Sequence, residues 1–354
     1  MSAQRDTAVD FFRGVVIINM ILVHFSSNFP GGIAVIIESL DFAIEGFVFL
    51  AGFMIGKHYL PKFTRDKRDV VKRLFSRAAK LVVIQYIMIL TISLPFYSYF
   101  YLNGYNENFQ FAVSSFLFLN QIPILHILPT FIPLFILSPV ILFLLFKNYD
   151  FLLMAISVGV FLLGCYDPYI FIIKEKAIFP VVLWQIYFVV GSIAGKFSSK
   201  NMRLDYNRLF ISAVLLYMIC FLMKYGGYYR FFHDIKAQFD IYPKKFPLNV
   251  YGFLYGSSLL FLLYALTVKL WSVLKKCASV FNVLSLFGRY SLLVFIIHAY
   301  FVYLIRSAKQ LGMETYIVSA LIAGTFIVTY KLSSLIDQRY QRNELPFAYR
   351  WLLS

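Results

Sequence analysis

The stretch DFFRGVVIINMILVH, residues 10–24, decides how the chain is interpreted. Most of it is apolar enough to cross a membrane, yet it places Asp10 and Arg13 at one end and His24 near the other. An ionisable side chain at the centre of a bilayer costs about 2.5–3.5 kcal/mol, so such residues are usually kept where they face a cavity or take part in chemistry. This stretch therefore predicts a membrane helix with a functional polar stripe.

Helical geometry places these three polar residues on roughly one face. Arg13 and His24 are eleven positions apart, which returns the side chain to nearly the same face about 16 Å further along the helix. Asp10 precedes Arg13 by three positions and shares that face approximately. The alternative interpretation is a positive anchor at one end of the helix and an ordinary packed histidine at the other.

The composition extends the membrane interpretation to the whole chain. The protein has 354 residues, of which 60% are hydrophobic, and its mean hydropathy is +0.74. No soluble domain of this size needs so much apolar sequence, so the expected class is an all-α, polytopic integral membrane protein. With roughly 20 residues per crossing, about ten transmembrane helices fit. They cover residues 8–27, 37–57, 76–97, 122–146, 150–166, 178–195, 208–224, 248–268, 283–305 and 313–336.

The distribution of charge predicts how these helices are oriented. A net charge of +16 would suggest a nucleic-acid partner in a soluble protein. Here the alternate connections on one side carry about twice as many Lys and Arg residues as those on the other, and residues 57–73 alone hold seven. Both termini are therefore expected in the cytoplasm, with the basic side facing anionic lipid and no nucleic-acid partner. No internal repeat or soluble segment is evident, so residues 1–354 are expected to form a single transmembrane domain.

Three further polar residues lie within expected helices, at a depth similar to that of His24. They are Glu45 in the second helix, His126 at the outer end of the fourth and His298 in the ninth. Together with His24 they could converge from four helices, where a carboxylate would orient a neutral imidazole that takes a proton. The alternatives are packed histidines and, for His126, an interfacial one. No metal site is expected, because the histidines belong to separate helices.

Glycine, proline and aromatic residues give weaker signals. The pair Gly52 and Gly56 has the spacing of a close helix contact. Three prolines within residues 127–139 predict a disturbed fourth helix. The aromatic segments 96–111 and 225–246 suit either an interfacial belt or a floor for stacking sugar rings. Of the outer cations, Arg230, Lys244 and Lys245 could pair with a substrate carboxylate.

Basic residues also gather toward the inner ends of several expected helices. Such a set could hold the phosphates of a nucleotide donor, through charge and through the fork of the arginine guanidinium. Arg13, paired with Asp10, and Arg77 are the strongest members, and the others are Arg73, Lys80 and Arg289. The positive-inside distribution alone would also produce this clustering.

Five sequence segments, in order along the chain, resemble one family. They are RDTAVDFFRG (5–14), FAIEGFVFLAGFMIG (42–56), ILPTFIPLFILSPVILFLL (127–145), WQIYFVVGSIAG (184–195) and GRYSLLVFIIH (288–298). Together with the Arg–ten residues–His spacing, they resemble the membrane acyltransferase type-three superfamily, and most closely the succinyltransferases of osmoregulated periplasmic glucans. The chain differs from the family's pattern at two points: it has Ala51–Gly52 where Ser–Gly is expected, and His126 where an acidic residue is expected. These differences bear on which acyl group is transferred and which acceptor is used.

The resemblance implies a membrane-bound O-acyltransferase with no bound cofactor. His24 would be the catalytic histidine, and Arg13 would help to engage succinyl-CoA or acetyl-CoA as donor substrate. The acceptor would be a hydroxyl of a periplasmic or surface glycan, and the location a bacterial inner membrane crossed many times. Two other classes stay open: a transporter or flippase that uses the buried charges as a proton relay, and a structural or receptor subunit.

Overall fold

The computed structural model describes residues 6–101, 104–118, 124–168, 180–199, 206–225, 244–342 and 344. These residues form helices and no named strand, as the composition predicts. The chain divides into two compact units: Met1–Ala43, Thr91–Tyr101 and Thr267–Ser354 in the first, and Ile44–Leu90 and Leu102–Leu266 in the second. Each unit is described by itself below, and the expected single domain stays a prediction.

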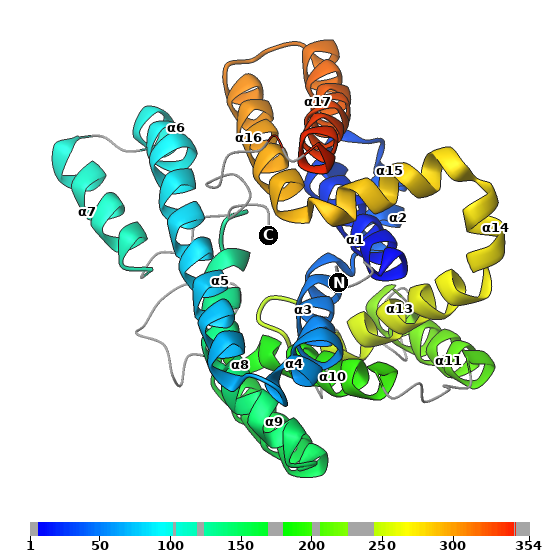
Figure 1. The fold of residues 1–354 in the computed structure, drawn as a ribbon. Helices are drawn as coiled ribbons and strands as arrows, with labels where there is room; N and C mark the ends of the chain where they lie inside the picture. The colour runs from blue at the N-terminus through cyan, green and yellow to red at the C-terminus, as the bar shows by residue number, and fades with distance from the viewer. Residues whose placement is uncertain are drawn as a thin grey trace. The chain divides into compact units, whose positions relative to one another are not determined.

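The first unit contains seven α-helices in its described part. They are α1 (Thr7–Phe25), α2 (Gly31–Ser39), α6 (Leu94–Phe100), α14 (Trp271–Lys276), α15 (Ala278–Arg289), α16 (Ser291–Gln310) and α17 (Thr315–Gln341). Asp6 caps α1, since its carboxylate accepts hydrogen bonds from the backbone N–H groups of Ala8 and Val9. The helix α1 packs along α15 and α16, and α16 packs on α17 (Figure 1).

The second unit is built around α10 in its described part. Its helices are α3 (Ala43–Met54), α4 (Leu60–Phe63), α5 (Lys67–Met88), α7 (Tyr105–Phe116), α8 (Ile127–Phe146), α9 (Asp150–Tyr166), α10 (Val181–Ser199), α11 (Tyr206–Tyr225) and α13 (Val250–Lys269). A π-helical turn, Ile55–Tyr59, joins α3 to α4. The fully buried Trp184, Tyr187 and Phe188 of α10 form much of the core.

Each of the ten expected spans overlaps a helical segment of the described residues, but not always one helix. Seven helices of the described residues are long and apolar enough to cross a membrane, which fits a polytopic membrane protein; the count of ten and the location of the termini stay predictions. The expected span 37–57 is interrupted between α2 and α3. There the side-chain amide of Asn19 in α1 donates to the Leu40 carbonyl (3.0 Å) and accepts from the Phe42 N–H (3.1 Å). These two hydrogen bonds satisfy backbone groups at the point where the helix is interrupted.

Two other expectations are refined by the structure. The expected span 283–305 is divided at Tyr290, where α15 ends and α16 begins. The prolines expected to disturb the fourth helix do not break it, because α8 is one continuous helix with Pro133 and Pro139 inside it. Proline within membrane helices is tolerated where neighbouring groups satisfy the freed backbone.

A seam of four glycines joins α3 and the π-helical turn to α10. A Cβ atom built on Gly52 or Gly56 would lie 1.9 Å from a backbone carbonyl oxygen of α10. The relation is reciprocal, since one built on Gly191 or Gly195 would lie 2.1 Å from a carbonyl oxygen of α3. Gly52 faces the carbonyl of Phe188, and Gly56 faces that of Ser192. In the other direction, Gly191 faces the carbonyl of Phe49, and Gly195 faces that of Phe53. The packing role predicted for Gly52 and Gly56 is thus confirmed.

Candidate functional site

His24 and His298 meet within the first unit. His24 lies in the last turn of α1 and His298 near the middle of α16, and His24 Nδ1 is 2.7 Å from His298 Nε2. The two rings are nearly parallel, with centroids 4.8 Å apart and an interplanar angle of 9°. His298 is fully buried and His24 is half-buried. The structure thus brings together two of the four predicted catalytic residues, from segments 274 residues apart.

Glycines explain how α1 comes so close to its neighbours. A Cβ atom on Gly14 would lie 1.9 Å from the Leu284 carbonyl oxygen, and one on Gly288 would lie 1.7 Å from the Asp10 carbonyl oxygen. Only hydrogen fits at these two positions, so the backbones of α1 and α15 are in direct contact. Because α16 follows α15 after a single residue, this contact also sets the position of α16 beside α1.

Charged side chains gather where α1 contacts α15. Asp10 is buried and lies 3.6 Å from the guanidinium of Arg13, which confirms the predicted pair. Arg289 Nη1 donates to Asp337 Oδ1 at 2.6 Å, and the Tyr290 hydroxyl donates to the same oxygen at 2.9 Å. Gly288, the residue before Arg289, lies against the Asp10 backbone, which places the two ion pairs near one another. We call this group, made of Asp10, Arg13, Arg289, Tyr290 and Asp337, the arginine–carboxylate cluster.

The histidine pair lies on the same two segments as Arg13 and Arg289 of the arginine–carboxylate cluster, whose Asp337 belongs to α17. In each segment an arginine comes first and a histidine follows, as Arg13 and His24 in α1 and as Arg289 and His298 across α15 and α16. The two contacts, Asp10 with Gly288 and His24 with His298, show that these segments run in the same direction. Along α1 the two groups are separated by eleven residues, or about 16 Å.

Glu45 lies in the second unit with a partner that the sequence did not indicate. Its carboxylate is 2% exposed and lies 3.1 Å from the ammonium group of Lys245. Tyr187 and Gly256 are close to it, since a Cβ atom on Gly256 would lie 2.8 Å from both the Glu45 carboxylate and the Tyr187 hydroxyl. Lys244 and Lys245, two of the three outer cations considered above, are described, and Arg230 lies outside the described residues.

His126 and Arg77 also belong to the second unit. His126 directly precedes α8, and its backbone carbonyl accepts a hydrogen bond from the Thr130 hydroxyl at 3.3 Å. The guanidinium of Arg77 lies over the Tyr59 ring, 5.2 Å from its centroid. Their convergence with His24, like that of Glu45, stays a prediction.

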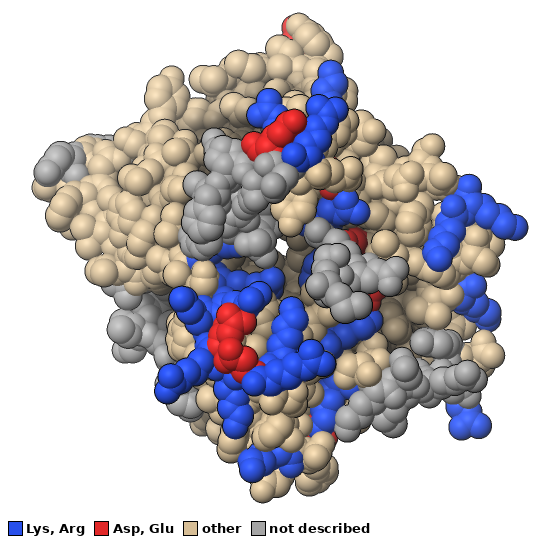
Figure 2. Space-filling view, viewed as in Figure 1, with Lys and Arg blue, Asp and Glu red and all other residues tan. Residues whose placement is uncertain are grey.

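Basic side chains cover the surface around α4 and the start of α5 in the second unit. Figure 2 shows Lys and Arg side chains gathered over this region around a few acidic ones. The exposed cations of this segment are Lys62, Arg65, Lys67, Arg68, Lys72 and Arg73. Most of the positive charge that residues 57–73 carry in the sequence is therefore exposed on the surface.

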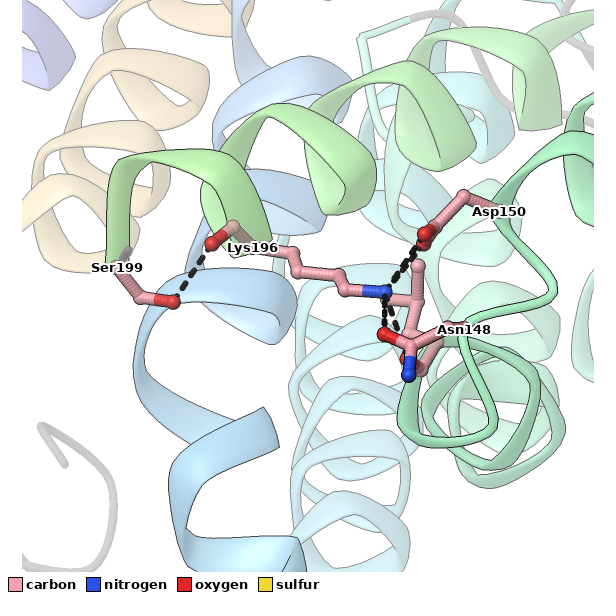
Figure 3. A network of polar contacts seen from close by, with 5 residues as sticks. Asn148, Asp150, Lys196 and Ser199 are labelled. Carbon is pink, nitrogen blue, oxygen red and sulfur yellow. Dashed lines mark hydrogen bonds and ion pairs between the residues drawn. The ribbon is translucent and has the colours of Figure 1, made fainter. Parts of the chain in front are cut away.

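Sequence reasoning missed one buried charge that has several close partners. Lys196 of α10 is 2% exposed, and its ammonium group lies 2.7 Å from each oxygen of Asp150 (Figure 3). It also donates to the Leu145 carbonyl at 2.8 Å and to Asn148 Oδ1 at 3.0 Å. We call this group the lysine cluster. Its sequence signal is a lysine in the last turn of one apolar helix and an aspartate at the start of another.

The fold and these polar groups define a membrane protein in which two neighbouring helical segments carry both a histidine pair and the arginines of an arginine–carboxylate cluster. Among the described residues, no group of three or more His, Cys, Asp or Glu residues could hold a metal ion.

The sequence profile described as "OpgC protein" matches residues 5–342, so the chain belongs to the OpgC family, the succinyltransferases of osmoregulated periplasmic glucans. Membership places it among the glucan-modifying acyltransferases of the membrane. Neither a curated protein nor a solved structure matches the chain.

Proposed function

We propose that the protein transfers a succinyl or acetyl group from acyl-CoA on the cytoplasmic side of a bacterial inner membrane to hydroxyl groups of a periplasmic or surface glycan. The contact between His24 and His298 carries this proposal, because it holds an imidazole close to a second imidazole on a neighbouring helix. Arg13, on the same helix as His24, supports it, because its guanidinium supplies a cation for a phosphorylated donor.

In the proposed reaction, His24 is the general base. The glycan hydroxyl oxygen attacks the thioester carbonyl carbon while its proton moves to the imidazole of His24. The carbon–sulfur bond breaks, and the departing CoA thiolate recovers a proton from the imidazolium, so the enzyme returns to its starting state. A positioned base of this kind contributes about 10²–10⁴-fold to the rate.

Arg13 is the proposed contact for the phosphates of the donor. Its side chain is 21% exposed and is held by Asp10 at 3.6 Å, longer than a strong ion pair. Because the guanidinium is partly exposed, a phosphate can reach it while Asp10 stays buried. In the second unit Arg77, beside the exposed cations of α4 and α5, is a further proposed contact, and Glu45 and His126 are proposed contributors to catalysis.

The test compares the wild-type protein with His24→Ala in a strain that lacks its own copy. Mass spectrometry of the extracted glycans reports the mass of each added group, which separates succinylation from acetylation. We expect the His24→Ala glycans to lack the modification at an equal level of membrane protein. His58→Ala is the matched control, since His58 lies in the π-helical turn of the second unit and has no proposed role. Equal modification by wild type and His24→Ala would reject His24 as the base.

A second measurement separates an enzyme from a transporter. Purified protein in lipid is mixed with acyl-CoA and an acceptor glucan, and the release of free CoA thiol is followed. We expect thiol release that depends on both the acceptor and His24. Transport of the glucan or of the acyl anion without thiol release would favour the transporter.

A further inference from the structure

The ring of His298 has a contact on each of its two nitrogens. Its Nδ1 lies 3.3 Å from the backbone carbonyl oxygen of Phe295, one turn earlier in α16. A carbonyl oxygen can only accept a hydrogen bond, so the proton of a neutral His298 ring is on Nδ1. The rings of Phe25 and Phe295 lie 6.3 and 6.1 Å from the His298 ring and help to fix its orientation.

This assignment determines the proton position on His24. With Nδ1 protonated, the Nε2 atom of His298 is an acceptor, and it lies 2.7 Å from Nδ1 of His24. His24 must therefore donate from Nδ1, and a neutral His24 ring then has no proton on Nε2. Two protonated rings would place two positive charges side by side at this distance, which disfavours the doubly protonated pair.

We propose that His298 is a positioning residue that holds His24 in the Nδ1-protonated tautomer, so that Nε2 of His24 is the atom that takes the proton. The chain of donors runs from His24 through His298 to the Phe295 carbonyl. Free neutral histidine favours the opposite tautomer, with the proton on Nε2. The contact with His298 therefore converts a ring that would present a donor into one that presents a base.

The same contact also supports the charged form that arises during the reaction. When Nε2 of His24 accepts the hydroxyl proton, the imidazolium keeps its Nδ1–H donated to His298 Nε2. A hydrogen bond from an ionised donor is roughly twice as strong as a neutral one, so the pair stabilises the protonated base without moving any other proton. The catalytic meaning of the tautomer rests on the proposed function, whereas the tautomer itself does not.

The experiment that tests the tautomer is nitrogen-15 NMR of purified protein labelled at histidine. The chain has five histidines, so the His24 signals are assigned by their loss in His24→Ala. We expect the wild-type spectrum to show His24 protonated on Nδ1. In His298→Leu we expect the proton to move to Nε2, while His298→Gln, whose amide oxygen replaces the acceptor, should keep the wild-type tautomer. A wild-type His24 protonated on Nε2 would overturn the proposal, and this result does not depend on any His298 variant folding.

Kinetics of the same variants separate positioning from a merely structural role. We expect His298→Leu to lower kcat by about 10²-fold while the KM for acyl-CoA stays constant, and His298→Gln to restore most of the kcat. Equal losses in both variants would contradict positioning through the acceptor atom. If the tautomer is as proposed but His24→Ala keeps its activity, the proposed function of His24 fails while the tautomer assignment stands.

Discussion

The lysine cluster of the second unit and the histidine pair of the first both place ionisable groups among apolar helices, but they satisfy them differently. The Lys196 ammonium has three hydrogens, and a carbonyl, an amide oxygen and a carboxylate account for them. The rings of the histidine pair share a hydrogen bond, His298 also contacts a carbonyl, and an imidazole is a group that can gain or lose a proton. A charge surrounded by fixed acceptors holds the structure, whereas a titratable pair is equipped for chemistry.

The difference shows why burial alone does not identify a functional residue. Lys196 is as deeply buried as Glu45, yet it joins the end of α8 to the start of α9 and has no need of a substrate. The number and kind of partners, rather than burial, distinguish the lysine cluster from the histidine pair. Each of the following substitutions tests that separation, beginning with the largest expected effect.

Lys196→Met should lower the free energy of unfolding by about 3 kcal/mol, near the lower end for a broken buried pair, because Asp150 is 25% exposed and can regain some water. Unfolding in detergent, followed by circular dichroism, measures the loss. The activity per folded molecule should not change. A loss of activity without a loss of stability would mean that the lysine cluster has a direct part in the reaction.

Gly288→Ala should destabilise the first unit by about 2 kcal/mol, because the new methyl group would meet the Asp10 carbonyl oxygen at 1.7 Å and a backbone atom cannot rotate away. It should also lower activity, since the shift would separate α16 from α1. Gly324→Ala is the matched control: it lies in α17, and its nearest neighbour would be a ring carbon of Phe301 at an ordinary 3.4 Å. The two thermal unfolding curves, compared directly, should differ clearly.

Arg13→Lys and Arg289→Lys should have opposite consequences. Arg13 is partly exposed and is the proposed phosphate contact, so its replacement should raise the KM for acyl-CoA about tenfold, or about 1.4 kcal/mol of binding, with little change in stability. Arg289 bonds Asp337 at 2.6 Å, so its replacement should cost about 1–2 kcal/mol of stability and leave the KM nearly unchanged. Matched effects on KM would show that both arginines contact the donor.

Asp69→Asn should have the smallest effect, below about 0.5 kcal/mol, because its ion pair with Arg73 is exposed to solvent on both sides. Urea or thermal unfolding of this variant sets the baseline for the others. A loss as large as that of Lys196→Met would contradict the view that partners and burial, rather than charge itself, decide the cost.

The positions of the helices were predictable because apolar runs of membrane length are a strong signal. The break between α2 and α3 was not, because it depends on Asn19 of another helix, whose amide satisfies the backbone at Leu40 and Phe42. Among the site residues, the pairing of Asp10 with Arg13 follows from helix spacing and is confirmed.

Long-range partners were the part that sequence reasoning could only guess. Similar depth suggested that His24 and His298 could meet, and they do. The same reasoning applied to Glu45 gave no hint of Lys245, which lies 200 positions later in a connection rather than in a span. Depth restricts which residues can meet, but the rotation and neighbours of each helix decide which ones do.

The glycine seam between α3 and α10 restricts how the family can vary. A harmful substitution in a core is often rescued when a neighbouring side chain becomes smaller. At Gly52, Gly56, Gly191 and Gly195 the obstacle is a main-chain oxygen, which every amino acid carries. A smaller neighbouring side chain cannot make room there, so a substitution at these positions can be accommodated only by moving the two helices apart.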